Sequence, residues 1–101
     1  MANTVKTILG DESLTILVTG MFTFPIHREF RDAYRTAPNT VKNFVVDLAA
    51  ADNLDSSALG MLLQLNEFAA DQGGHVEVTN CNERVLAVLK IAHFETMFDI
   101  T

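Results

Sequence analysis

The chain has 101 residues, 49% of them hydrophobic, and a formal net charge of −6. This length predicts one domain over residues 1–101, with a modest core and no room for a deep substrate cleft between two lobes. The acidic balance argues against nucleic acid and anionic membrane surfaces as partners, because both require clustered Lys and Arg. The chain shows no signal peptide and no apolar run long enough for direct membrane insertion, so we expect a cytoplasmic protein.

The first third of the chain predicts a β-hairpin followed by a helix. Residues 4–9 and 14–19 favour strands, joined by a turn at Gly10 and Asp11, and the second strand is expected to stop at Gly20. A helix is then expected to begin near Pro25, because proline is tolerated in the first turn. Its apolar face recurs with helical spacing at Ile26, Phe30, Ala33, Tyr34 and Ala37.

The middle third predicts a strand, a loop and a second helix. Residues 44–48 are nearly all apolar, which is typical of a strand buried on both faces, and residues 49–54 are expected to form a loop. The helix that follows is expected to end at Gly73 and Gly74. Its apolar stripe consists of Ala58, Met61, Leu62, Leu65, Phe68 and Ala69.

The last third predicts a strand over residues 75–79, a third helix and a short edge strand over residues 97–100. Asn80 and Glu83 have the spacing of a capping box at the start of that helix. The buried face of the helix is expected to comprise Val85, Val88, Leu89 and Ala92.

The predicted order is β-β-α-β-α-β-α-β, which indicates an α/β fold: a mixed sheet with helices packed against it. The initial hairpin is antiparallel, and the later strands pair in parallel through right-handed crossovers. Because binding sites in such sheets lie where strands end and helices begin, residues 20–25 and 49–57 are the candidate site.

One segment of this candidate site resembles a known family signature. Asp55-Ser56-Ser57-Ala58-Leu59-Gly60, preceded by Val45-Val46-Asp47-Leu48, is similar to the motif of STAS domains, the sulfate-transporter and anti-sigma-factor-antagonist domains. The family motif has an apolar strand ending in Asp-Leu, a loop, and Asp-Ser-Ser-Gly-Leu-Gly opening a helix. The resemblance extends over essentially the whole chain and implies the STAS fold.

The resemblance is to bacterial anti-sigma factor antagonists, and it implies a function. In them the serine after the motif's aspartate is phosphorylated by an anti-sigma factor that is a serine kinase, and a serine phosphatase removes the phosphate. The unphosphorylated form binds the anti-sigma factor and frees the sigma factor. By this resemblance Ser56 is the phosphorylation site, Ser57 is the next candidate, and the chain is a regulator rather than an enzyme. We expect the partner-binding residues to be Met21, Phe22, Thr23, Phe24, Asp55, Ser56, Ser57, Ala58, Leu59 and Gly60.

The residues themselves allow simpler interpretations. Ser56 and Ser57 suit helix capping whatever the protein does. Met21, Phe22 and Phe24 form either an apolar docking patch or a cover for the end of the sheet.

Two positions depart from the family pattern. Ala58 replaces the motif's first glycine, and Thr23 stands where antagonists often carry an aspartate. The second departure keeps open an alternative function, a STAS-type cytoplasmic subunit of an ABC-type membrane transport assembly.

The remaining polar residues do not form a recognisable catalytic or metal-binding motif. His27, His75 and His93 are far apart in the sequence, and Cys81 has no Cys or His at metal-ligand spacing, so we expect no metal and no cofactor. Arg28, Arg31 and Arg35 align on the first helix, either as a solvated face paired with Glu29 and Asp32 or as a partner-binding stripe.

Overall fold

The computed structural model describes residues 3–101 and shows an α/β fold whose mixed sheet carries three α-helices. The strands lie in the order β1-β2-β3-β5-β6, with β4 beside the end of β2. Among the strand pairs within residues 3–101, β1–β2 is antiparallel and the others are parallel. In chain order the elements are β1 (Thr4–Leu9), β2 (Ser13–Phe22), the 3₁₀ turn η1 (Phe24–Ile26), α1 (His27–Arg35), β3 (Asn43–Asp47), β4 (Ala51–Leu54), α2 (Ser56–Asp71), β5 (His75–Thr79), α3 (Glu83–Ile91), the 3₁₀ turn η2 (Phe94–Thr96) and β6 (Asp99–Ile100).

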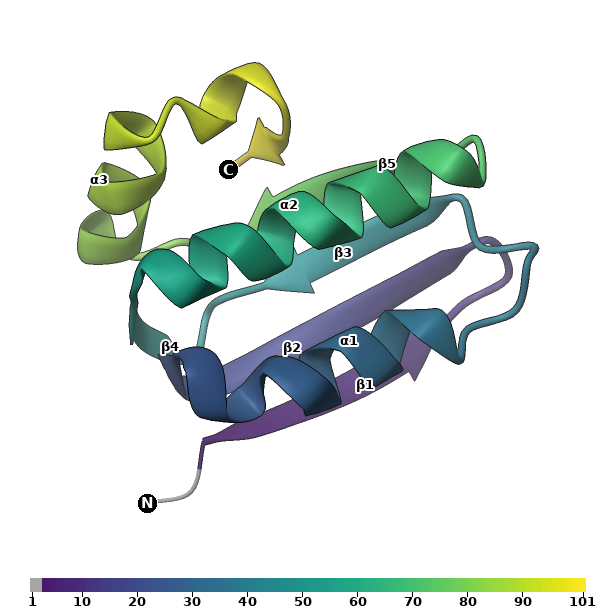
Figure 1. Cartoon of the computed structure of the whole chain (residues 1–101), viewed down its shortest axis with the longest axis horizontal. Coiled ribbons are helices and arrows are strands. Elements are labelled where there is room, and N and C mark those ends of the chain that lie inside the picture. Colours follow the sequence, from purple (N-terminus) through teal and green to yellow (C-terminus); the bar gives the residue numbers. More distant parts are fainter. Residues whose placement is uncertain (1–2) are drawn as a thin grey trace.

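Helices α1 and α2 lie side by side over one face of the sheet, while α3 packs beyond its end, next to β4 (Figure 1). Burial therefore alternates along the strands: in β2 every second residue from Leu14 to Val18 is buried. The prediction that residues 44–48 are buried on both faces was wrong. Phe44 and Val46 are buried, but Val45 between them is only half-buried, because no helix covers its face.

The predicted helical faces are confirmed. On η1 and α1, Ile26, Phe30 and Tyr34 are buried and Ala33 is half-buried, while Ala37 lies just beyond the end of α1. On α2 the stripe is buried except for the half-buried Phe68. Aromatic rings link the two helices, since the Tyr34 and Phe68 centroids are 5.0 Å apart. The ring of Phe68 also meets Phe44 of β3 edge-on, at 6.0 Å. The core is thus continuous from α1 through α2 to the sheet.

Strand β2 does not stop at Gly20 as predicted but continues to Phe22. Gly20 has a φ of +85°, and the register with β4 shifts between Gly20 and Met21. Such an irregularity bends the strand and suits glycine, because a side chain is strained at positive φ. Here a Cβ would also clash with the side chain of Asn3. A glycine that looks like a strand terminator in the sequence is therefore a bend inside the strand.

The predicted loop over residues 49–54 contains the strand β4. It pairs in parallel with the far end of β2, on the side where β3 pairs with the near end. The turn between β3 and β4 is held by Asp47, whose Oδ1 accepts hydrogen bonds from the Ala49 N–H at 2.9 Å and from the Asn80 amide at 3.2 Å. The strand is short and its exposed residue Asp52 is charged, so its sequence lacks a β pattern.

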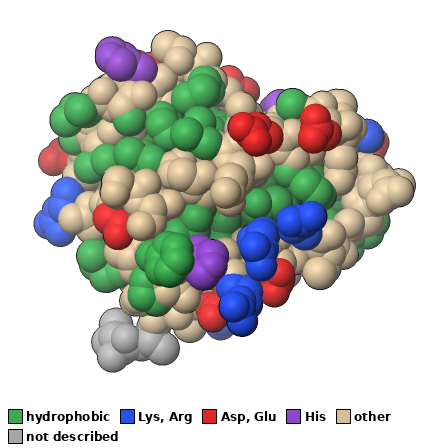
Figure 2. Space-filling view, viewed as in Figure 1, with side chains coloured by type: hydrophobic (Ala, Val, Ile, Leu, Met, Phe, Trp, Pro, Cys, Tyr) green, Lys and Arg blue, Asp and Glu red, His purple; other side chains and the backbone are tan. Residues whose placement is uncertain are grey.

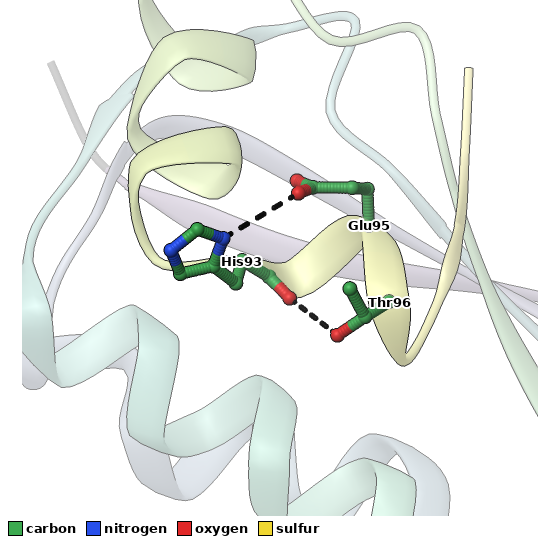
Figure 3. Close-up of polar contacts among 3 residues, drawn as sticks. All are labelled: His93, Glu95 and Thr96. Atoms are coloured by element: carbon green, nitrogen blue, oxygen red, sulfur yellow. Dashed lines mark hydrogen bonds and ion pairs between the residues drawn. The ribbon is translucent and has the colours of Figure 1, made fainter.

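The third helix begins later than the capping box predicted. Asn82, not Asn80, is the N-cap, and its Oδ1 accepts a hydrogen bond from the Val85 N–H at 2.8 Å. After α3, His93 adopts a left-handed conformation, φ 60°, and starts the turn η2 (Figure 3). The Thr96 hydroxyl donates to the His93 carbonyl at 2.7 Å, and His93 Nδ1 lies 3.8 Å from Glu95 Oε1. This turn brings the chain back to pair as β6 with β5.

Helix α2 ends, as predicted, at Gly73 and Gly74. The N–H of Gly74 donates to Ala69 O at 2.8 Å and that of Gly73 to Ala70 O at 3.0 Å, the Schellman pattern that satisfies the last carbonyls of a helix. At Gly74 the chain passes so close to the Lys42 carbonyl that a Cβ would overlap with it. Gly60, in the middle of the same helix, has open space around the position of a Cβ.

These two glycines give a matched test of the fold. We expect Gly74→Ala to lower the free energy of unfolding by more than about 1 kcal/mol, because the backbone of Lys42 has to move. Gly60→Ala is expected to raise it by roughly 0.5–1 kcal/mol, because alanine has the higher helix propensity and nothing obstructs it. Urea denaturation of both variants and the wild type measures the difference. Equal effects at the two positions would contradict the close approach at Gly74.

Candidate functional site

The two predicted segments meet at one end of the sheet. Parallel pairing sets Phe22 opposite Leu54 at the ends of β2 and β4, and the Asp55 N–H donates to Phe22 O at 3.4 Å. The chain leaves β2 through Thr23 and leaves β4 through Asp55, so these two exits are neighbours. The prediction that residues 20–25 and 49–57 form one site is therefore consistent with the strand pairing.

The start of α2 is capped by Asp55 and not by a serine. Asp55 is the N-cap, and its Oδ1 accepts a hydrogen bond from the Ala58 N–H at 3.1 Å. Ser56 is then the first helical residue, with an exposed side chain, and Ser57 is half-buried. The interpretation that a serine caps the helix was therefore wrong. Because Asp55 is the cap, the Ser56 hydroxyl is not required to stabilise the start of α2.

The site residues divide by burial into a surface and a support. Ser56 and Asp55 are exposed, Met21 and Phe24 are 40% and 60% exposed, and Thr23 is half-buried. Leu59 and Gly60 are also half-buried. Two residues expected to contact a partner are instead in the core: Phe22 and Ala58 are both 0% exposed. Their side chains pack beneath the surface and do not belong to it, since both point toward the helix–sheet layer.

Phe22 and Phe24 illustrate how one apolar cluster splits between core and surface. The Phe22 ring packs against Phe30 of α1, with centroids 5.0 Å apart. The Phe24 ring lies outside and stacks on His27, with centroids 4.2 Å apart and planes 13° apart. His27 Nδ1 lies 2.9 Å from Phe24 O, which helps to fix the imidazole against the phenyl ring. The interpretation of a cover for the sheet is confirmed for Phe22, whereas Phe24 is exposed to solvent, and its role in docking stays a prediction.

The sequence analysis missed one surface residue, Leu63, which is 38% exposed. Leu63 lies seven positions after Ser56 on α2, and Gly60 lies between them, so helical spacing places all three on one face. The signal was present in the sequence, because Leu63 falls outside the buried stripe of α2. An apolar side chain two turns from an exposed serine, with a small residue between, allows close approach of another protein.

Two opposing electrostatic effects would act on a negative charge added at Ser56: attraction by the N-terminus of α2 and repulsion by Asp55. The first backbone N–H groups of a helix and its dipole attract anions, by roughly 0.3–1 kcal/mol at exposed sites. Asp55 is next to Ser56 and repels them, while no further acidic residue lies in the first turn of α2. A phosphate on Ser56 is therefore compatible with the folded chain.

Cys81 and the remaining acidic and histidine side chains are the other candidates for chemistry. Within residues 3–101 no group of three or more His, Cys, Asp or Glu side chains could hold a metal ion. Cys81 is half-buried, and burial raises the pKa of its thiol, which makes it a poor nucleophile at neutral pH. No helix in the described part of the chain is long and apolar enough to cross a membrane.

Removing the cap separates its role from that of the serine. We expect Asp55→Ala to lower the free energy of unfolding by about 1 kcal/mol, because the Ala58 N–H loses its side-chain partner. Ser56→Ala is expected to change it by less than about 0.5 kcal/mol, as for other exposed positions. Urea denaturation of the two variants decides, and a larger loss for Ser56→Ala would mean that the serine caps the helix after all.

Comparison with known proteins agrees with this architecture. The family model described as "Mlab, STAS domain" matches residues 6–99. A STAS-domain containing protein of Pseudomonas aeruginosa (strain UCBPP-PA14) is 42% identical over 101 residues, which is the whole of both chains.

Two solved structures share the fold at low sequence identity. The anti-sigma factor antagonist SpoIIAA of Bacillus, known in unphosphorylated and phosphorylated forms, superposes in the former with a TM-score of 0.77 at 17% identity, over 99% of this chain and 87% of that one. A sulfate transporter family protein from Wolinella succinogenes superposes with a TM-score of 0.78 at 15% identity, over 89% of this chain and 75% of that one. Because the family model matches residues 6–99 and a relative is 42% identical over its full length, the chain belongs to the STAS domain family.

Proposed function

We propose that this chain is a non-catalytic anti-sigma factor antagonist that works by partner switching. Its unphosphorylated form binds an anti-sigma factor with serine-kinase activity in the cytoplasm and so frees a sigma factor. Phosphorylation of Ser56 releases the partner, and a serine phosphatase restores binding. The single observation that carries the proposal is the exposed Ser56 hydroxyl at the start of α2, which Asp55 leaves free by capping the helix itself.

The surroundings of Ser56 supply a docking surface for such a partner. Met21 and Phe24 offer apolar contacts from the end of β2, and Leu63 offers another from α2. Apolar side chains contribute to binding energy when a partner removes them from water, roughly in proportion to the area buried. Gly60, between Ser56 and Leu63, has no side chain, and nothing lies within 4 Å of the position that a Cβ would take, so a partner can approach the helix backbone closely there.

The same surface explains release without a change of shape. A phosphate on Ser56 adds about −1.5 to −2 charges at neutral pH. The free protein keeps that charge in water, whereas a partner seated on Ser56 has to strip water from it beside the Asp55 carboxylate. A loss of about 3 kcal/mol corresponds to roughly a hundredfold in affinity, because each 1.4 kcal/mol is tenfold. Ser57 is the less suitable target, since its side chain is half-buried.

The presence of Thr23 favours a second candidate function, that of a STAS-type cytoplasmic subunit of an ABC-type transport assembly. Antagonists often carry an aspartate in this loop, and the half-buried Thr23 lies beside the exit from β4 where that carboxylate would stand. In this second function the surface around Ser56 binds an ATPase or permease constitutively, and phosphorylation has no role.

Affinity capture from the source cell distinguishes the two functions. The baits are the wild type, Ser56→Ala, Ser56→Asp and, as a matched control, Ser57→Ala. We expect the wild type, Ser56→Ala and Ser57→Ala to retain the same kinase-like partner and Ser56→Asp to lose at least nine-tenths of it. Intact-mass spectra after incubation with that kinase are expected to show one added phosphate on the wild type and on Ser57→Ala but none on Ser56→Ala.

Two outcomes would overturn the switch. Capture of the same membrane ATPase or permease by all four baits would replace it with the transport function. Phosphate on Ser56→Ala in the amount found on the wild type would move the modification to another residue.

A further inference from the structure

A groove of about 310 Å³ runs between α1 and α2, away from the end of the sheet that carries Ser56. Its floor is aromatic, formed by Tyr34 and Phe68, whose rings are in contact. Its two walls carry opposite charges. Figure 2 shows Lys and Arg side chains gathered over α1, with acidic side chains beside them, and further acidic side chains over α2, with apolar surface between the two helices. The charged residues that line the groove are Arg31 and Arg35 on one side and Glu67 and Asp71 on the other.

The charges on the two walls stand at matching heights. Both helices run in the same direction (Figure 1), and the contact between Tyr34 and Phe68 sets these two residues level. With a rise of about 1.5 Å per residue, Arg35 then lies within about one helical turn of both Glu67 and Asp71. Arg31 lies at a similar distance from Glu67 along the axis. Each wall is therefore a pair of like charges spaced one turn apart.

These charges are not used inside the chain. Within residues 3–101 the one ion pair between side chains is His93–Glu95, so neither arginine of the groove is within 4.0 Å of a carboxylate. Both arginines also lie close enough to the floor to act on the Tyr34 hydroxyl. Burial raises the pKa of this hydroxyl, and the charges of Arg35 and Arg31 partly oppose the increase. Two unpaired cationic and two unpaired anionic side chains thus frame one apolar floor.

We propose that this groove joins two copies of the chain around a twofold axis that runs along it. Rotation by 180° about that axis lays α1 of one copy over α2 of the other and keeps all four helices in the same direction. The arginine pair of each copy then faces the acidic pair of the other, and the aromatic floors meet in the centre. A twofold interface requires a surface that complements itself, and a positive and a negative wall at equal heights provide one.

The face that carries the groove is large enough for such a contact. The molecule measures 33 × 31 × 19 Å, and α1 and α2 lie on its broad side (Figure 1). A stable interface buries about 800 Å² on each partner, which this side can supply. Because the ion pairs would be at a polar rim, they select the arrangement more than they strengthen it. We therefore expect a weak, specific dimer.

Charge reversal tests the arrangement. One variant carries Arg31→Glu with Arg35→Glu, so that both walls are acidic; the other carries Glu67→Lys with Asp71→Lys, so that both are basic. Sedimentation velocity in 0.1 M NaCl, over protein concentrations up to 1 mM, is expected to show that the wild type dimerises. Each variant alone should have a dissociation constant at least tenfold weaker, and an equimolar mixture of the two should form a heterodimer with an affinity near that of the wild type.

Two control variants carry the same net charges with the groove intact: Arg84→Glu with Lys90→Glu on α3, and Asp11→Lys with Glu12→Lys in the first turn. Both are expected to dimerise like the wild type. The restored heterodimer also shows that neither groove variant has merely failed to fold. A monomeric wild type at 1 mM, a mixture that stays monomeric, or controls that lose dimerisation equally would each overturn the proposal.

Discussion

The geometry of the site depends on the way in which β2 is shared between two parallel partners. Its first half pairs with β3 through residues such as Ile16 and Val46, and its last three residues pair with β4. The Gly20 N–H donates to Ala50 O at 2.9 Å at the point where one partner gives way to the other. Without the bend at Gly20 the strand could not follow β4, and the exits at Thr23 and Asp55 would not be neighbours. A backbone conformation that only glycine adopts readily thus determines where the surface around Ser56 is built.

The sheet has a second property that shapes the molecule, because its helices cover one face only. The covered face holds the large core side chains, among them Phe44, Val46 and Phe22. Both surfaces with proposed roles lie on this helical layer: one at the start of α2, the other in the groove nearer its end. Their separation along a helix of 16 residues allows the two contacts to differ in chemistry. The surface around Ser56 combines exposed apolar side chains with the Ser56 hydroxyl and the Asp55 carboxylate, whereas the groove has two walls of opposite charge.

Much of the architecture was predictable from the sequence because periodicity records burial. The stripe on α2 follows from one covered face and was predicted at the residues where it occurs, whereas β2 was predicted at the right place but too short. The failures have a common cause, which is that tertiary contacts override local signals. Strand β4 has no alternating pattern, since its four residues are held by pairing with β2 and not by a face of their own. Gly20 has the signature of a stop and acts as a bend.

Capping was the least predictable feature, for a chemical reason. Asp, Asn and Ser all accept hydrogen bonds from the first N–H groups of a helix, so a run of such residues leaves the boundary undetermined. Asp55 precedes two serines, and Asn82 follows Asn80 by two positions. The structure decides each case through one distance, that from Asp55 to the Ala58 N–H and that from Asn82 to the Val85 N–H. The choice at α2 bears on the proposed function, because Ser56 can be modified without loss of the hydrogen bond that caps the helix.

The neutral side chain of Thr23 affects the electrostatic repulsion that a phosphate on Ser56 would experience in the free protein. With an aspartate in that loop, two carboxylates would flank the modified serine and repel it. Here only Asp55 does so, while the N-terminus of α2 attracts the phosphate from the other side. The free phosphorylated form is then less strained electrostatically than in a chain with both acids. The affinity lost on phosphorylation would come mainly from the partner's side of the interface, where the dianion has to be stripped of water. Substitution of Thr23 by aspartate would shift part of that cost back onto the free protein.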